Sequence, residues 1–286
     1  MELLQLNKFG DLHNGKTIIF CKTDFLKDEF KKIAKLKNEV VLISGNGDEG
    51  IGSSLTSIMP DNIRLWYCQN KLTYHEKLVS LPIGLENTSV NKRKGHGVAW
   101  PHAIKKINIL NEIFDSKETP VPSKFLYANF NTQTNATYRN PIREICMGTP
   151  FINWDEPSLN YADFIQNVLD HEATICPAGN GIDTHRLYEV LYCKRIAITV
   201  KTGDYPVYNE LYRNLPIVIL NHVEELEDRD KLLELIAVAQ QKKENLDLID
   251  FNYWRNSIAD ASKHIFREDN ASRKTFANYF KWKNSI

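Results

Sequence analysis

A glycine-rich stretch followed by ionisable residues is the part of this sequence whose spacing best suits chemistry. An apolar strand predicted at 173–177 leads into Gly179-Asn-Gly181, and Asp183 and Thr184 then open a predicted helix. Another strand is predicted at 196–200, and a strand–helix–strand unit joins parallel strands by a right-handed crossover. Backbone N–H groups at the start of such a helix attract anions. We therefore expect a phosphorylated ligand to bind at this loop.

The predicted helix has one polar and one apolar face. At about 100° per residue, His185, Arg186 and Glu189 lie together, opposite Leu187 and Val190. The polar face would carry three ionisable side chains to the ligand site, at the carboxyl edge of a sheet. The alternative interpretation is an ordinary turn and helix start, with a solvated pair of His185 and Glu189.

Composition indicates a globular protein that does not depend on net charge for binding. The chain has 286 residues, of which 42% are hydrophobic and 25% charged. Its 36 Lys and Arg residues balance 36 Asp and Glu residues, which argues against nucleic acid as a partner. We see no transmembrane run and no signal peptide. Five widely spaced cysteines are typical of buried, reduced thiols, so the sequence predicts a cytoplasmic protein, in a bacterium or a virus-infected host cell.

Both halves of the chain alternate predicted strands with predicted helices, and Pro120-Val-Pro122 separates them. The first half has strands predicted at 17–21, 40–44, 64–68 and 78–83, and helices at 24–37 and 103–114. The second half has strands predicted at 124–130, 150–154, 173–177, 196–200 and 215–220, and helices at 140–147, 161–169, 224–241, 251–264 and 272–282. This alternation indicates two α/β domains, 1–122 and 123–286, that face each other across a ligand-binding cleft.

The second half resembles a known family of enzymes. Gly-Asn-Gly-Ile-Asp-Thr-His-Arg at 179–186, then Glu189, Tyr-Pro-Val-Tyr at 205–208 and Leu-Pro-Ile-Val at 215–218, is similar to the pattern of the exostosin-like glycosyltransferases. Asn-Phe-Asn-Thr at 129–132, with Arg139 after it, resembles the opening of their donor domain, which binds the nucleotide-sugar.

The first half is similar to small bacterial and viral members of that family. The similarity is in Leu-Ile-Ser-Gly-Asn-Gly-Asp-Glu-Gly at 42–50, Trp-Tyr-Cys-Gln-Asn at 66–70 and Leu-Pro-Ile-Gly-Leu-Glu at 81–86. The whole resemblance covers about residues 40–222. It implies a GT-B fold of two Rossmann-like domains, transfer from a nucleotide-activated sugar to a glycan acceptor, and a donor site in the C-terminal domain.

The expected donor site follows from the charge of the leaving group. A nucleoside diphosphate gains negative charge as the glycosidic bond breaks, so N–H groups and guanidinium groups should be aimed at it. Glu189 is our candidate for accepting hydrogen bonds from the two hydroxyls of a ribose. The full set of predicted donor residues is Thr132, Arg139, Asn180, Gly181, Asp183, Thr184, His185, Arg186 and Glu189.

An inverting transfer needs a base that takes the proton of the acceptor hydroxyl. Asp48 is the first candidate, because Gly45-Asn-Gly47 follows a buried strand and would let the backbone turn tightly. Glu49 and His102 are the alternatives. Gln69 and Asn70, at a predicted strand end, are candidates for acceptor contact. For each of these residues, the alternative is an ordinary turn or loop position.

The sequence predicts no cofactor and no metal requirement. GT-A glycosyltransferases hold a divalent cation with an Asp-x-Asp loop, and here only Asp228-Arg-Asp230 matches that pattern, in a charged helical stretch. We therefore predict a metal-independent glycosyltransferase that uses a UDP-sugar. The alternatives are an epimerase-like enzyme of the same fold and a non-catalytic module that binds nucleotides or carbohydrates.

Overall fold

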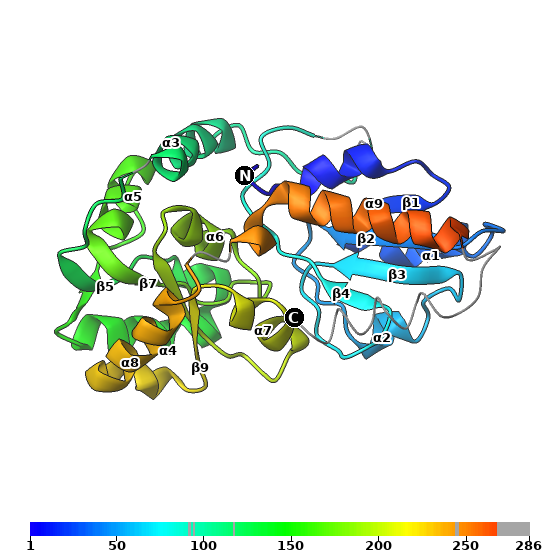
Figure 1. The fold of residues 1–286 in the computed structure, drawn as a ribbon. Helices are drawn as coiled ribbons and strands as arrows, with labels where there is room; N and C mark the ends of the chain where they lie inside the picture. Colours follow the sequence, from blue (N-terminus) through cyan, green and yellow to red (C-terminus); the bar gives the residue numbers. More distant parts are fainter. Residues whose placement is uncertain (91–92, 94, 117, 244–245, 268–286) are drawn as a thin grey trace.

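The computed structural model describes residues 1–90, 93, 95–116, 118–243 and 246–267, and these form two parallel β-sheets side by side (Figure 1). The first sheet has the order β1 (Ile18–Lys22), β2 (Val40–Gly45), β3 (Ile63–Cys68) and β4 (Leu78–Ser80). The second has the order β6 (Ile152–Trp154), β5 (Lys124–Ala128), β7 (His171–Ile175), β8 (Ile196–Val200) and β9 (Ile217–Leu220).

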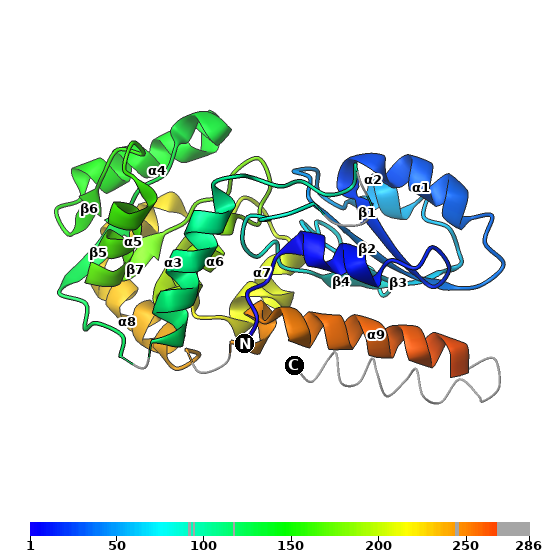
Figure 2. The ribbon, with the colours of Figure 1, turned by 90° about the horizontal axis from the view of Figure 1, so that it is seen from above.

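Helices cover both faces of the first sheet (Figure 2). On one face lie α1 (Leu26–Ile33) and α2 (Ser53–Thr56), and on the other lie the 3-10 helix η1 (Leu6–Leu12) and the long α9 (Phe251–Arg267). Because both faces are covered, the sequence of β2 is apolar almost throughout, and every residue in it is buried. The C-terminal helix thus returns to complete the first domain.

The second sheet is also sandwiched between helices. One hydrophobic cluster joins it to α4 (Ala136–Gly148) and α8 (Arg229–Gln240), and another joins it to α5 (Tyr161–Asp170) and α6 (His185–Tyr192). The helix α3 (Ala103–Asp115) packs on α6, and α7 (Pro206–Glu210) links β8 to β9. The remaining 3-10 helices are η2 (Thr23–Phe25), η3 (Thr132–Asn135), η4 (Tyr212–Asn214), η5 (Val223–Glu227) and η6 (Asp247–Ile249).

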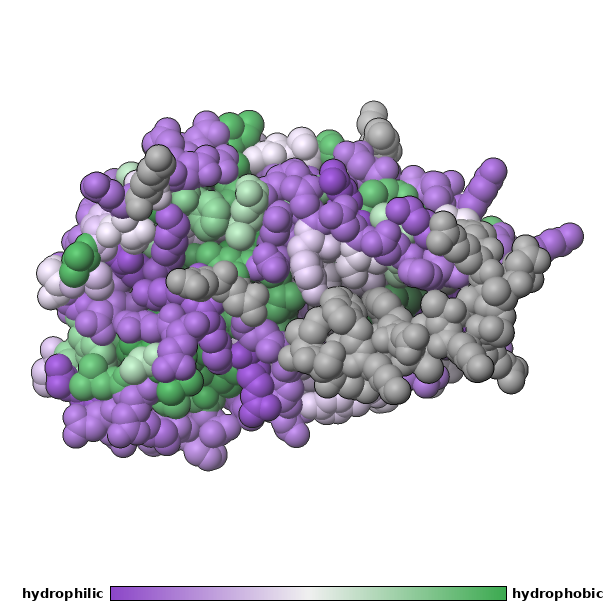
Figure 3. Space-filling view, viewed as in Figure 1, coloured by the Kyte–Doolittle hydropathy of each residue, from purple (hydrophilic) through white to green (hydrophobic). Residues whose placement is uncertain are grey.

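The two domains share buried contacts on one side of their junction. A single hydrophobic cluster includes side chains of β2 and β3 as well as α5 and α6. Within it, the backbone N–H of Leu4 donates to the Tyr192 hydroxyl at 2.9 Å, and that hydroxyl donates to the Ile249 carbonyl at 2.5 Å. Among the residues that are coloured in Figure 3, hydrophilic ones make up most of the surface in view. The domains are therefore joined by a core rather than by a flexible linker alone.

The predicted α/β architecture of two Rossmann-like domains, the GT-B arrangement, is confirmed by these sheets. The helix predicted at 224–241 is divided into η5 and α8, because the Asp228 side chain accepts a hydrogen bond from the Lys231 N–H and starts a new helix. The helix predicted at 272–282 lies outside the described residues. The boundary at residue 122 stays a prediction, since α3 precedes it yet packs on α6 of the second domain.

Two smaller expectations from composition can also be compared with the structure. All five cysteines are free and buried, as predicted. Among the described residues, no helix is long and apolar enough to cross a membrane.

Candidate functional site

A cleft of about 570 Å³ lies between the two domains and has residues of both in its walls. The first half of the chain contributes Asp48, Ile83, Glu86, Trp100 and Lys106. The second half contributes the glycine-rich loop after β7, the start of α6, and residues that follow β5. These loops meet here because the carboxyl ends of parallel strands share one edge of each sheet.

The helix α6 presents the faces that the sequence predicts. Leu187 and Val190 are buried against the second sheet, whereas Arg186 and Glu189 line the cleft. Thr184 occupies the N-cap position, and its side chain makes no capping hydrogen bond. The N-terminus of α6 therefore has N–H groups that are free of a side-chain cap and lie beside the cleft, which suits an anion.

Arg186 is the cation at the centre of the second-domain wall. Its guanidinium lies 3.6 Å from the centre of the Phe164 ring, and its Nε is 3.5 Å from Glu189 Oε2. Its Nη1 is buried and makes no hydrogen bond to any described residue. The Phe164 ring and Glu189 thus hold the guanidinium in place, while its Nη1 donor is left without a partner among the described residues.

Lys106 and Glu86 are two cleft residues to which the sequence analysis gives no role. The Lys106 Nζ lies 2.9 Å from Glu86 Oε2 and 3.6 Å from Glu189 Oε1, so it joins carboxylates on both walls. His102 Nε2 lies 3.1 Å from the same Glu86 oxygen. Burial alone would raise the pKa of Glu86, but Lys106 and the nearby histidines outweigh it and hold that pKa below its ordinary value.

The position of Glu86 in the sequence is a weak indication that it lies at the site. Glu86 ends the segment 81–86, which resembles the family and follows β4, at the edge of the sheet where loop residues enter the cleft. No comparable signal marks Lys106, because its two partners come from the loop after β4 and from α6, and only the tertiary packing of α3 on α6 brings them together.

Asp183 is buried where the two domains touch. Its carboxylate accepts hydrogen bonds from the hydroxyls of Tyr188 and Tyr212 and from the backbone N–H of Ile83, at 2.9, 2.6 and 2.6 Å. Burial raises its pKa to about 6, against the effect of these donors. Asp183 is thus among the residues that line the cleft, but it is almost fully buried and links the loop of the first domain to two tyrosines of the second.

Arg139 supports the loop from behind. Its Nε, Nη1 and Nη2 donate to the carbonyls of Ala178, Asn131 and Pro177 at 2.8, 2.7 and 3.1 Å. Burial, and then the positive charge of Arg186, lower its pKa from the ordinary value. Arg139 lines the cleft, but these contacts show that it also holds two loops in place.

The other predicted donor residues lie along the glycine-rich loop or next to it. His185 Nδ1 is 2.8 Å from the Gly84 carbonyl, and Asn180 Nδ2 donates to Asp48 Oδ2 at 3.2 Å across the cleft. At Gly181 an added Cβ would lie 2.5 Å from the Asn70 amide nitrogen, so a larger residue would displace the Asn70 side chain, which accepts a hydrogen bond from the Asp183 N–H. Thr132 lies in η3, and its neighbours Asn131 and Thr134 line the cleft.

The candidates for base and acceptor contact occupy different environments. Asp48 is exposed and lines the cleft, and Glu49 is exposed beside it. Gln69 and Asn70 are buried: the Gln69 side chain accepts from the Asn46 N–H at 3.0 Å, and that of Asn70 accepts from the Asp183 N–H at 3.0 Å. Their amides therefore connect parts of the protein in this structure.

The described residues contain no cluster of side chains of the size that usually binds a metal ion. Among them, no group of three or more His, Cys, Asp or Glu side chains is placed to hold a metal ion. Asp228, the first residue of the Asp-Arg-Asp sequence, caps α8 through the Lys231 N–H. Metal-independent chemistry stays a prediction that an experiment must test.

The fold defines a two-domain α/β protein, and the cleft between its domains is lined by Arg186 and by the start of α6. No protein-family model matches its sequence, and no curated protein sequence matches it. Among solved structures, a crystal structure of an α1,3-fucosyltransferase with GDP-fucose is similar at 12% identity and a TM-score of 0.38, over 83% of this chain and 82% of the other. The wall teichoic acid polymerase TagF is similar at 14% identity and a TM-score of 0.26, over 92% of each chain. At this level of likeness, neither neighbour identifies what this chain binds.

Proposed function

We propose that this protein is a glycosyltransferase that binds a nucleotide-sugar, with UDP as the nucleotide, against the second domain and transfers the sugar to a glycan acceptor. The observation that carries the proposal is Arg186, whose buried Nη1 lacks a hydrogen-bond partner among the described residues, next to the uncapped start of α6. A diphosphate at this place would satisfy both groups. The family resemblance of segment 179–189 agrees with this assignment.

In the proposed reaction, each wall of the cleft binds one of the two substrates. Arg186 and the N–H groups at the start of α6 would stabilise the negative charge that develops on the diphosphate oxygen as the bond to the sugar breaks. Glu189 would accept hydrogen bonds from the ribose hydroxyls through the lone pairs that its contacts with Lys106 and Arg186 leave free. The acceptor hydroxyl would attack the anomeric carbon from the opposite side and give its proton to Asp48, so that the reaction inverts the configuration.

Titration calorimetry with UDP tests the donor site. Charge-assisted hydrogen bonds to phosphate contribute about 1.5–3 kcal/mol, so Arg186→Ala should weaken UDP binding by about 10- to 150-fold. The matched control is Arg143→Ala on α4, because Arg143 pairs with Glu156 and does not line the cleft. If the wild-type protein failed to bind UDP, or if both variants bound it equally well, the donor assignment would be wrong.

Turnover separates the transferase from the two alternatives. A transferase releases UDP and forms a glycosidic bond to an added sugar, which NMR of the products detects. Conversion of one UDP-sugar into its epimer, with no UDP released, would indicate the epimerase-like enzyme. Tight binding of UDP without release from any UDP-sugar, across a panel of sugar acceptors, would indicate the non-catalytic module.

A further inference from the structure

The part of the cleft wall that belongs to the first domain carries an exposed tryptophan. Trp100 lines the cleft and is 46% exposed, whereas Phe130, an aromatic residue of the other wall, is only 4% exposed. An indole that is about half exposed beside a polar cleft has a large apolar area that a ligand can cover. The position of this side chain in the wall of the cleft, rather than its exposure alone, makes it a candidate for ligand contact.

Trp100 and Glu86 both contact His102. The rings of Trp100 and His102 have centres 6.0 Å apart, and His102 Nε2 lies 3.1 Å from Glu86 Oε2. The backbone N–H of Trp100 donates to the carbonyl of Asn87, the residue after Glu86, at 3.0 Å. An apolar ring face and a carboxylate are thus neighbours on one wall of the cleft.

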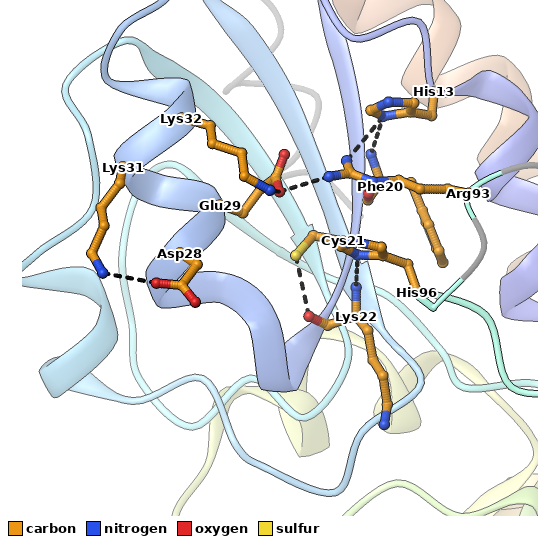
Figure 4. A network of polar contacts seen from close by, with 10 residues as sticks. All are labelled: His13, Phe20, Cys21, Lys22, Asp28, Glu29, Lys31, Lys32, Arg93 and His96. Atoms are coloured by element: carbon orange, nitrogen blue, oxygen red, sulfur yellow. Dashed lines mark hydrogen bonds and ion pairs between the residues drawn. The ribbon is translucent and has the colours of Figure 1, made fainter.

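The segment that carries Trp100 is fixed to the first domain at several points. Arg93 Nη2 donates to Glu29 Oε2 at 2.6 Å and its Nη1 donates to the Phe20 carbonyl at 2.8 Å, while His96 Nδ1 accepts from the Lys22 N–H (Figure 4).

Nearer to Trp100, the Asn7 side chain donates to the Val98 carbonyl at 2.8 Å. These contacts fix the backbone of the segment that leads to Trp100, and a fixed backbone reduces the entropy lost on binding.

We propose that Trp100 and Glu86 form the subsite for the acceptor sugar: one face of the pyranose ring stacks on the indole, and a ring hydroxyl donates a hydrogen bond to the Glu86 carboxylate. The inference rests on the proposed function, because the nucleotide-sugar then occupies the opposite wall. A pyranose matches both features, since its C–H groups give it an apolar face and its hydroxyls lie around the edge. Trp100 and Glu86 are thus binding residues, and the proton goes to Asp48.

Fluorine NMR of protein labelled with 5-fluorotryptophan tests the subsite without knowledge of the natural acceptor. The chain has five tryptophans, and the resonance lost in Trp100→Phe identifies Trp100. With UDP at saturation, the protein is titrated with methyl β-D-galactopyranoside, methyl β-D-glucopyranoside and methyl β-D-xylopyranoside. We expect at least one of them to shift the Trp100 resonance in a saturable way.

The second half of the experiment concerns Glu86. The variant Glu86→Gln should weaken the binding of that glycoside by about tenfold, because the hydroxyl then donates to a neutral amide oxygen instead of a charged carboxylate. Glu112→Gln, an exposed position on α3, is the control and should leave the affinity unchanged. Both variants should keep the affinity for UDP, which shows that the cleft is intact.

The possible outcomes separate this inference from the proposed function. If the protein binds UDP but none of the three glycosides shifts the Trp100 resonance, the subsite is wrong. Equal weakening in Glu86→Gln and Glu112→Gln would also overturn it. If a glycoside shifts the Trp100 resonance while UDP does not bind, the subsite stands and the nucleotide-sugar proposal fails.

Discussion

The Lys71 ammonium lies 2.6 Å from the Glu210 carboxylate, and this ion pair connects the two domains beneath the cleft. The Lys71 side chain is 1% exposed, and its Nζ also donates to the Leu78 carbonyl at 2.9 Å. Glu210 in turn accepts from the Ser80 hydroxyl at 2.8 Å. Every donor here lies in the first domain, and the acceptor carboxylate comes from α7 of the second.

Removing the cation alone should destabilise the protein. Lys71→Met leaves Glu210 partly buried without its partner, which typically costs about 3–5 kcal/mol, and we expect the lower end because Glu210 retains 26% exposure. Lys71→Met combined with Glu210→Met should recover most of that loss. Urea unfolding measures both, with the exposed Lys35→Met as control. A loss in Lys71→Met no larger than in the control would show that the pair contributes little to stability.

Asp48→Asn should separate catalysis from donor binding. The substitution keeps the shape of the side chain but removes its capacity to take a proton, so kcat should fall by about 10²–10⁴-fold. The Kd for UDP should not change. Steady-state kinetics with a UDP-sugar and calorimetry with UDP provide the two numbers. A normal kcat would exclude Asp48 and direct attention to the alternatives Glu49 and His102, while a retained anomeric configuration in the product would exclude the inverting mechanism.

Chelation should have little effect on the reaction rate. Arg186 and the start of α6 are placed to supply the positive potential that a divalent cation supplies elsewhere. Activity measured in EDTA should therefore equal activity measured in buffer alone. Loss of activity in EDTA, with recovery on addition of Mn²⁺ or Mg²⁺, would contradict the metal-independent proposal.

Acid should weaken the anchorage of segment 93–98. Burial, and then the charge of Arg93, lower the pKa of both His13 and His96 below 6.5. As the pH falls through 6.5, these histidines bind protons in the unfolded chain before they bind protons in the folded protein. Protonation therefore favours the unfolded chain, and the folded protein loses stability below pH 6.5. Each ring also accepts a backbone N–H through Nδ1, a bond that needs this nitrogen unprotonated (Figure 4).

Thermal unfolding between pH 7.5 and 5 measures this effect. The melting temperature of the wild-type protein should fall more steeply toward pH 5 than that of a His13→Gln, His96→Gln double variant, whose amide oxygens still accept hydrogen bonds but do not titrate. Other groups that titrate in this range, such as Asp183, are common to both proteins, so their effect cancels in the difference. Parallel curves would contradict the lowered pKa values.

The helix that lines the cleft is predictable from sequence, because its two faces follow from periodicity alone. Leu187 and Val190 pack inward and Arg186 and Glu189 face the cleft, as a spacing of about 100° per residue requires. The strands are predictable for a similar reason: strands covered on both faces are continuous apolar runs.

The details that tertiary contacts determine are not predictable in this way. Asp183 reads as a helix-start residue that could face a phosphate, yet Tyr188, Tyr212 and the Ile83 N–H surround it at the domain junction. The pairing of Lys106 with Glu86 likewise depends on how α3 packs against α6. Such contacts join residues that are far apart in the chain, so a local sequence pattern cannot predict them.

The return of α9 to the first sheet constrains the order in which the protein can be completed on the ribosome. Trp254 packs edge-to-face on Tyr67, and the Tyr67 hydroxyl bonds to Ser257, so one face of the first sheet is covered by the last described helix. Domains usually finish folding in the order of synthesis. Here every described strand of the second domain precedes α9 in the chain, so the domain that is translated first is closed after the second has its sheet.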